Sequence, residues 1–135
     1  MAGVELRGKR VVLRPMTEID AERIAEIRAL PEVARWWRER DADYARSKLA
    51  DDDLTCWVVE LAGSVIGFVQ AYEEKDPEFR HAGLDLFLDT AFHRQGLGQD
   101  AVRTASRYLR EDRGHHVEER WADGVLLDLL ADELT

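Results

Sequence analysis

The sequence predicts an α+β domain in which a mixed, mostly antiparallel sheet is flanked by helices. Two apolar runs on either side of the short turn Ala62-Gly63 predict a β-hairpin, and alternation over Gly83–Asp89 predicts a central strand. A helix with a continuous apolar stripe follows that strand. No internal repeat, low-complexity tract or Gly/Ser linker interrupts the chain, so we expect residues 1–135 to form a single domain.

The first elements combine β-structure with helix. Residues Val4 to Met16 are rich in β-forming side chains and predict a strand or a bent pair of strands. Thr17 is placed to cap a helix that has Asp20 in its first turn and ends near Ala29. Two shorter helices are expected to follow, over Val33–Trp37 and Asp41–Ala50.

The second half begins with the hairpin strands Cys56–Leu61 and Ser64–Tyr72, which a charged loop from Glu73 to His81 separates from the central strand. The amphipathic helix begins near Gly98 and is expected to end at Gly114. The run from Gly124 to Leu130 is short enough for a buried strand, although its periodicity also allows a helix.

Composition limits the class of protein and its partners. The formal charge of −9 disfavours nucleic acid and anionic membrane surfaces and favours cationic ligands. No apolar run approaches the ~20 residues of a membrane span, and no export signal is visible, so we expect a cytoplasmic protein. The single cysteine, Cys56, lies in an apolar run and is expected to be a buried structural thiol.

A glycine-containing turn links the central strand to the long helix. Gly96 and Gly98 would let an anion approach the backbone N–H groups closely, while Leu97 would anchor the turn in the core. The pattern is neither a Walker P-loop nor a dinucleotide-binding Gly-x-Gly-x-x-Gly. The turn is therefore a phosphate-binding candidate, and the alternative is a plain loop into a helix.

From Leu6 to about His116 the chain resembles GNAT-type N-acetyltransferases, whose motif Arg/Gln-x-x-Gly-x-Gly/Ala is matched by the run from His93 to Gly98. His93 replaces the family's Arg or Gln, and the neighbouring Arg94 would supply the charge. The resemblance implies that acetyl-coenzyme A is the acetyl donor. An acidic protein would need a locally electropositive site for this anion. The implied cofactor-binding residues are Leu88, Arg94, Gln95, Gly96, Leu97, Gly98, Gln99 and Asp100.

Within this family the chain is most similar to the branch that acetylates aminoglycosides at the 6′ amine. The resemblance implies that Asp85 is the general base, that the acceptor is a small cationic amine, aminoglycoside-like or polyamine-like, and that acetyl transfer is direct. Asp85 would accept the acceptor's proton. Its alternative role is that of a solvated strand residue. The implied acceptor-binding residues are Trp36, Trp37, Gln70, Tyr72 and Glu73.

No metal site is expected. His115 and His116 follow the long helix, where their expected partner is the negative end of its dipole, and no third ligand has a recognisable spacing. The acidic run Asp51 to Asp53 is interpreted as a solvated loop, with an acidic acceptor pocket as its alternative.

The resemblance departs from the family after the long helix. A fifth strand, a helix bearing an Asn and a Tyr, and a sixth strand are expected to be missing between Arg113 and Val125, so the fold is predicted to be shortened near the C-terminus. Three interpretations remain: a shortened working enzyme, a degenerate or engineered domain, and a domain completed by another subunit. Exposed apolar surface beside the gap predicts a homodimer. The rival function is a non-catalytic binding or assembly module.

Overall fold

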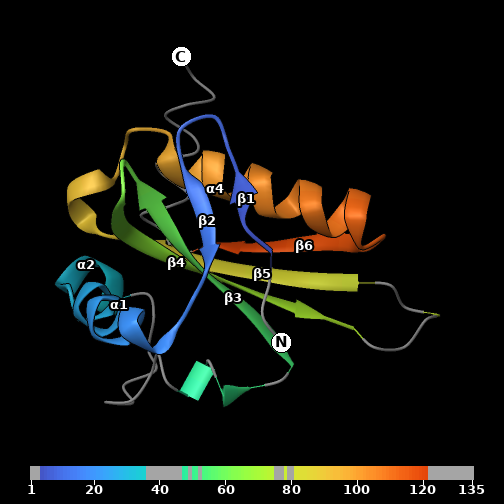
Figure 1. Ribbon diagram of the computed structural model, residues 1–135, viewed down its shortest axis with the longest axis horizontal. Helices are drawn as coiled ribbons and strands as arrows, with labels where there is room; N and C mark the ends of the chain where they lie inside the picture. Colours follow the sequence, from blue (N-terminus) through green and yellow to red (C-terminus); the bar gives the residue numbers. More distant parts are fainter. Residues whose placement is uncertain are drawn as a thin grey trace.

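The computed structural model describes residues 4–35, 47–48, 50–51, 53–74, 78 and 81–121. In this part of the chain one six-stranded sheet has its strands in chain order, from β1 to β6 (Figure 1). Every neighbouring pair is antiparallel except β5 and β6, which are parallel. The strands are β1 (Leu6–Arg7), β2 (Val12–Pro15), β3 (Leu54–Leu61), β4 (Ser64–Glu73), β5 (His81–Leu88) and β6 (His116–Trp121). The expected mixed, mostly antiparallel sheet is confirmed.

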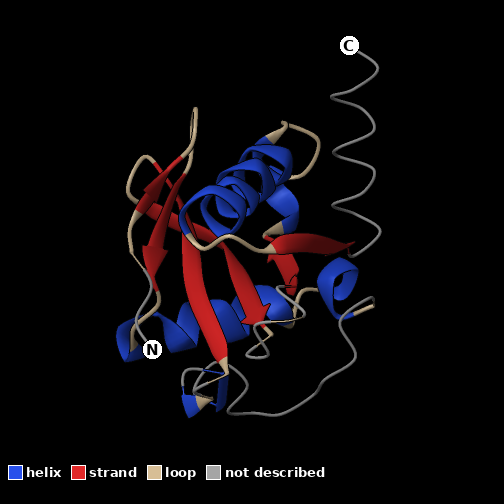
Figure 2. Ribbon diagram, turned by 90° about the vertical axis from the view of Figure 1, so that its right-hand side faces the viewer, coloured by secondary structure: helices blue, strands red, loops and turns tan. Residues whose placement is uncertain are grey.

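Helices cover both faces of the sheet. Figure 2 shows the long helix α4 on one face and α1 on the other. The helical segments are η1 (Glu18–Asp20), α1 (Ala21–Arg28), α2 (Pro31–Ala34), η2 (Thr90–Phe92), α4 (Leu97–Arg107) and the π-helical turn η3 (Tyr108–Asp112). This arrangement gives each face of the sheet its own apolar core.

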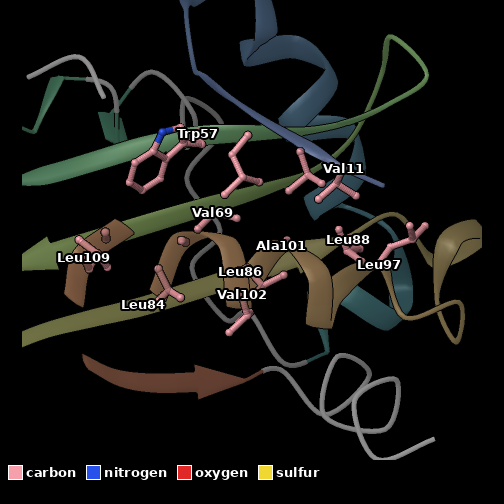
Figure 3. Close-up of a cluster of buried hydrophobic side chains, with 14 of the residues drawn as sticks. Val11, Trp57, Val69, Leu84, Leu86, Leu88, Leu97, Ala101, Val102 and Leu109 are labelled. Atoms are coloured by element: carbon pink, nitrogen blue, oxygen red, sulfur yellow. The ribbon is translucent and has the colours of Figure 1, made fainter. Parts of the chain in front are cut away.

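The alternation in β5 assigns its side chains to the two cores. Leu84, Leu86 and Leu88 are buried against the α4 side, together with Leu97 and Ala101 of that helix (Figure 3). The residues between them face α1: Phe87 packs against Phe68 of β4, with ring centroids 5.3 Å apart. Asp85 therefore lies on the α1 face of the sheet, opposite the core beneath α4.

The predicted hairpin is confirmed. Ala62 and Gly63 both have positive φ, 50° and 85°, which is the backbone of a type I′ turn and matches the twist of the two strands. The ladder continues from Leu61 opposite Ser64 to Leu54 opposite Tyr72. Cys56 is buried in this hairpin as predicted, and burial raises the pKa of its thiol to about 12.

The N-terminal elements also follow the prediction. Val4 to Met16 forms the bent pair β1 and β2, and the N–H of Thr17 donates to Asp20 Oδ2 at 2.8 Å where the helical segment begins. Helix α2 begins at Pro31, before the predicted Val33, because proline is favoured in a first helical turn. Of the helix expected over Asp41–Ala50, the residues 47, 48 and 50 are helical and the others lie outside the described residues.

The prediction that the strand after the long helix is missing was wrong. Strand β6 pairs with β5 from His116 opposite His81 to Trp121 opposite Leu86. The charged sequence between Val117 and Trp121 concealed this strand, because a strand on a parallel edge is stabilised by backbone hydrogen bonds to its neighbour. The run Gly124–Leu130, predicted as a buried strand, lies outside the described residues.

Candidate functional site

The first part of the site is a pair of polar side chains on the α1 face. Gln70 and Asp85 lie opposite each other in the register of β4 and β5, and Gln70 Nε2 donates to Asp85 Oδ2 at 3.2 Å. This donation orients the Gln70 amide, whose Oε1 is buried and has no hydrogen-bond partner among the described residues. A buried amide oxygen without a donor is costly, so the pair provides an acceptor position for a ligand N–H or O–H group.

The next register position leaves open space beside this pair. Gly83 lies opposite Tyr72, and apart from its two chain neighbours no described residue has an atom within 4 Å of the position that a Cβ would occupy at Gly83. Tyr72, the last residue but one of β4, is 44% exposed. The structure therefore brings three of the predicted residues, Gln70, Tyr72 and Asp85, to one face beside an unfilled position.

The second part of the site is the turn between β5 and α4. The His93 ring contacts the Leu88 carbonyl oxygen through Nε2 at 2.9 Å and connects the end of the strand to the turn. Arg94 and Gly96 have positive φ, 63° and 75°, so the chain reverses tightly before α4 begins at Leu97. Leu97 is fully buried, as the sequence predicted.

The residues of this turn have different roles. The Asp100 N–H donates to the Gly96 carbonyl at 3.1 Å, so this amide belongs to the helix and does not join an anion-binding set, contrary to our expectation. The Gln95 carbonyl accepts from the Arg10 guanidinium. The amides of Leu97, Gly98 and Gln99 precede the first helical hydrogen bond of α4 and form its N-terminal turn.

Asp100 has a structural role that the sequence analysis missed. Its carboxylate accepts the backbone N–H groups of Lys9, Arg10 and Val11 at 2.9, 2.8 and 2.9 Å. These bonds fasten the turn between β1 and β2 to the start of α4 (Figure 1). An acidic residue in the first turn of a helix is the only sequence signal for this contact, and it does not identify the partner.

Glu73 lies on the face of β4 opposite to Gln70 and Asp85, where it contacts Arg113 and His115. Its carboxylate accepts from Arg113 Nε at 2.9 Å and Nη2 at 3.1 Å, and His115 Nε2 lies 3.1 Å from it. The Arg113 hydrogen bonds outweigh burial and keep the pKa of Glu73 below its usual value. His115 Nε2 therefore contacts Glu73, while the His115 backbone N–H donates to the Leu109 carbonyl, at 2.9 Å, in the turn that ends the long helix. Trp36 and Trp37 lie outside the described residues.

A second ion pair that the sequence did not reveal lies at the end of β5. Arg23 of α1 binds Asp89 at 2.7 Å, and the Ala91 N–H donates to the same carboxylate at 3.0 Å. Burial alone would raise the pKa of Asp89, but these two partners outweigh it and lower the pKa. The contact connects α1 to the segment that leads into the glycine turn.

The described residues contain no group of three or more His, Cys, Asp or Glu side chains arranged to hold a metal ion. Within the same residues, no helix has the length and apolar character needed to cross a bilayer.

Comparisons with known proteins give consistent matches. The family model described as an acetyltransferase (GNAT) domain matches residues 10–123. The aminoglycoside N(6′)-acetyltransferase type 1 of Klebsiella pneumoniae is 31% identical over 123 residues, covering 76% of this chain and 60% of that protein. Human N-acetyltransferase 8 is 34% identical over 77 residues, covering 55% of this chain and 34% of that protein. The chain thus spans less than two thirds of the length of these curated relatives.

Solved structures match over most of the chain. The aminoglycoside acetyltransferase AAC(6′)-Ib in complex with coenzyme A and kanamycin has a TM-score of 0.71 and 28% identity, covering 91% of this chain and 81% of that one. The same enzyme with ribostamycin and coenzyme A has a TM-score of 0.73 and 26% identity, with coverage of 93% and 81%.

Proposed function

Because the chain belongs to the GNAT acetyltransferase family, we propose that it transfers the acetyl group of acetyl-coenzyme A to a primary amine of a small cationic acceptor. The observation that best supports this proposal is the position of the Asp85 carboxylate. It lies beside the Gln70 amide oxygen, which has no partner among the described residues, and beside the open position at Gly83. An amine acceptor needs both groups, since a carboxylate accepts its proton and an amide oxygen accepts a hydrogen bond.

Asp85 is the proposed general base. The acceptor ammonium loses one proton to the Asp85 carboxylate, directly or through a water, and its nitrogen then attacks the thioester carbonyl. The new C–N bond forms as the C–S bond breaks; the attacking nitrogen loses a second proton, the departing thiolate takes up one proton, and the remaining proton leaves from Asp85 to solvent. The products are an N-acetylated amine and coenzyme A, with no covalent enzyme intermediate.

The donor site is proposed at the turn between β5 and α4. Gly96 and the first residues of α4 present backbone to an anion, and the helix start adds partial positive charge. The end of β5 at Leu88 leads directly into this turn, and there we place the pantetheine arm. Leu88 lies two residues beyond Leu86, which pairs with Trp121 at the end of the described register of β5 and β6.

The acceptor is proposed to be an aminoglycoside or a polyamine. Two observations support a cationic ligand. The chain carries a formal charge of −9, and the curated relative that matches 76% of this chain is named as an aminoglycoside acetyltransferase. Of the other predicted acceptor residues, Tyr72 is suited to stacking against a sugar or an alkyl amine, whereas Arg113 and His115 engage the Glu73 carboxylate, so we do not include Glu73 in the proposed acceptor site.

The homodimer remains a prediction, although the reason first given for it no longer holds. We had expected bare apolar surface beside β5, but β6 occupies that edge. Sedimentation velocity over a wide range of protein concentrations tests it, and a single monomeric species throughout would contradict it.

Two experiments test the function. Calorimetric titration with acetyl-coenzyme A is expected to give saturable binding that Gly98→Val abolishes, because a β-branched side chain would block the backbone of the turn. Turnover is then measured with a panel of aminoglycosides and polyamines. Folded protein that binds the cofactor and acetylates none of them would favour the non-catalytic binding module.

A further inference from the structure

A groove runs between the turn that joins β1 to β2 and the exposed side of α4. It has a volume of about 340 Å³, and it begins at Gly96 of the glycine turn and extends along the helix. Gln99, Arg103 and Arg107 recur every four residues, so they form one stripe about 12 Å long on α4. The opposite wall comes from Arg7 to Arg10, some ninety residues away in the sequence.

The groove is basic, whereas the protein as a whole is acidic. Five basic side chains line it, namely Arg7, Lys9, Arg10, Arg103 and Arg107, although the chain as a whole carries −9. Asp100 is the one acidic residue of its lining, and three backbone N–H groups already bind its carboxylate. A concave site with one sign of charge concentrates the field and attracts ions of the opposite sign.

The groove is also held in shape. A Cβ at Gly8 would lie 2.6 Å from Asp100 Oδ1 and 2.7 Å from Thr104 Oγ1, so the turn packs directly on α4. Arg10 donates to the Gln95 carbonyl, which fixes one cation beside the glycine turn. Among the described residues no carboxylate pairs with the side chains of Lys9 or Arg107, so these two cations remain available to a ligand.

We propose that this groove is a binding site for a phosphate monoester, in which Lys9, Arg103 and Arg107 contact the phosphate. A phosphate dianion accepts several charge-assisted hydrogen bonds from guanidinium and ammonium groups at once. Two sources can supply it. One is the 3′-phosphate of coenzyme A, since the groove begins at the turn proposed to hold the cofactor, and in that case the site rests on the proposed function. The other is a separate phosphorylated small molecule.

The test compares coenzyme A, 3′-dephospho-coenzyme A and inorganic phosphate in titrations of the full chain. The wild type is compared with the double variant Arg103→Gln/Arg107→Gln. Arg110→Gln is the matched control, because it removes an exposed cation that follows α4 and does not line the groove. Circular dichroism and thermal melting establish that each variant is folded.

If the phosphate belongs to coenzyme A, the wild type binds coenzyme A about tenfold or more tightly than its dephospho form, and the double variant loses this difference. If it belongs to another molecule, the two cofactors bind equally. Inorganic phosphate then still binds wild-type protein saturated with dephospho-coenzyme A, and binds the double variant about tenfold more weakly. Arg110→Gln behaves like the wild type in either case.

Equal binding of the two cofactors, together with phosphate binding that the double variant does not weaken, would overturn the proposal. This result leaves the proposed function intact. Conversely, a folded protein that binds neither cofactor refutes the proposed donor site, while the phosphate titration still decides the groove. The comparison of the two cofactors on wild-type protein needs no variant, so a failure of the double variant to fold does not prevent the test.

Discussion

Gln70 Nε2 donates a hydrogen bond to Asp85 Oδ2 across adjacent strands, and the other end of the same amide, Oε1, is buried with no partner in the part of the chain that the structure describes. The bond to Asp85 fixes which end of the amide is presented to a ligand. One side chain thus orients the proposed base and offers an acceptor for a donor group of the substrate. The pair predicts separable effects of mutation on chemistry and on acceptor binding.

Asp85→Asn is expected to lower kcat/KM for amine acetylation by about 10²- to 10⁴-fold, because an amide cannot accept the ammonium proton. The affinity for acetyl-coenzyme A, measured by calorimetry, should be unchanged. Gln70→Leu is the companion variant, and it should raise KM for the acceptor more than it lowers kcat. If Asp85→Asn kept wild-type turnover, Asp85 would be a solvated strand residue with no part in catalysis.

Gly83→Ala and Gly83→Val are expected to weaken binding of the acceptor, and the larger valine side chain should have the larger effect. Each side chain fills space opposite Tyr72. Steady-state kinetics should give about a tenfold or larger loss in kcat/KM for the valine variant. Cofactor affinity and melting temperature are the controls. An unchanged acceptor KM in both variants would place the acceptor elsewhere.

Asp100→Ala is expected to destabilise the fold by about 2–4 kcal/mol, because three backbone N–H groups lose a charged acceptor. Urea unfolding followed by circular dichroism measures this. Glu26→Ala is the matched control, since Glu26 is 68% exposed and pairs only with Arg23 among the described residues, so its removal should change stability by less than about 0.5 kcal/mol. Similar losses in both variants would contradict the role of Asp100.

Stability is expected to fall at acid pH, in part through Asp20. Burial alone would raise the pKa of this carboxyl, but Arg14 and Thr17 outweigh it and hold the pKa below 3.8. The folded state therefore binds fewer protons than the unfolded state, and the stabilisation is present above about pH 3.8 and lost as pH falls through the folded pKa. In urea unfolding, the stability advantage of wild type over Asp20→Asn should be constant well above pH 3.8 and shrink as the pH falls below about 3.8. A constant difference would contradict the assignment.

Cys56 is expected to be inert toward thiol reagents in the folded protein at about pH 8, because burial raises its pKa to about 12. Ellman's reagent should react with the chain only after denaturation. In assays of the folded protein, the same reagent can therefore measure released coenzyme A without a background signal from Cys56. Rapid labelling of folded protein would show that the hairpin opens.

The sequence predicted the elements whose signals are local. The hairpin depends on the turn chemistry of Ala62 and Gly63, and β5 depends on the alternation of Leu84, Leu86 and Leu88 with polar and aromatic neighbours. Strand β6 has no such signal, because a neighbouring strand and the crossover through α4 stabilise it. This is why we expected the chain to lack it.

The candidate site was predictable in part for the same reason. The family resemblance pointed to Gln70, Tyr72 and Asp85, which the register of β4 and β5 brings to one face, and the glycine motif marked the turn before α4. The carboxylate of Asp100 and the basic groove were not predictable, because their partners at Lys9 and Arg10 come from the opposite end of the chain. Only the folded structure brings the two segments together.

The order of the strands has a kinetic consequence. Each strand pairs with the next one in the chain, so the sheet can assemble from sequential contacts. The bond from Lys9 to Asp100 spans 91 residues, and closing so long a loop has a large entropic cost before the rest of the sheet is present. We therefore expect this bond to form after the folding transition state, so that Asp100→Ala accelerates unfolding in stopped-flow experiments and leaves the refolding rate nearly unchanged.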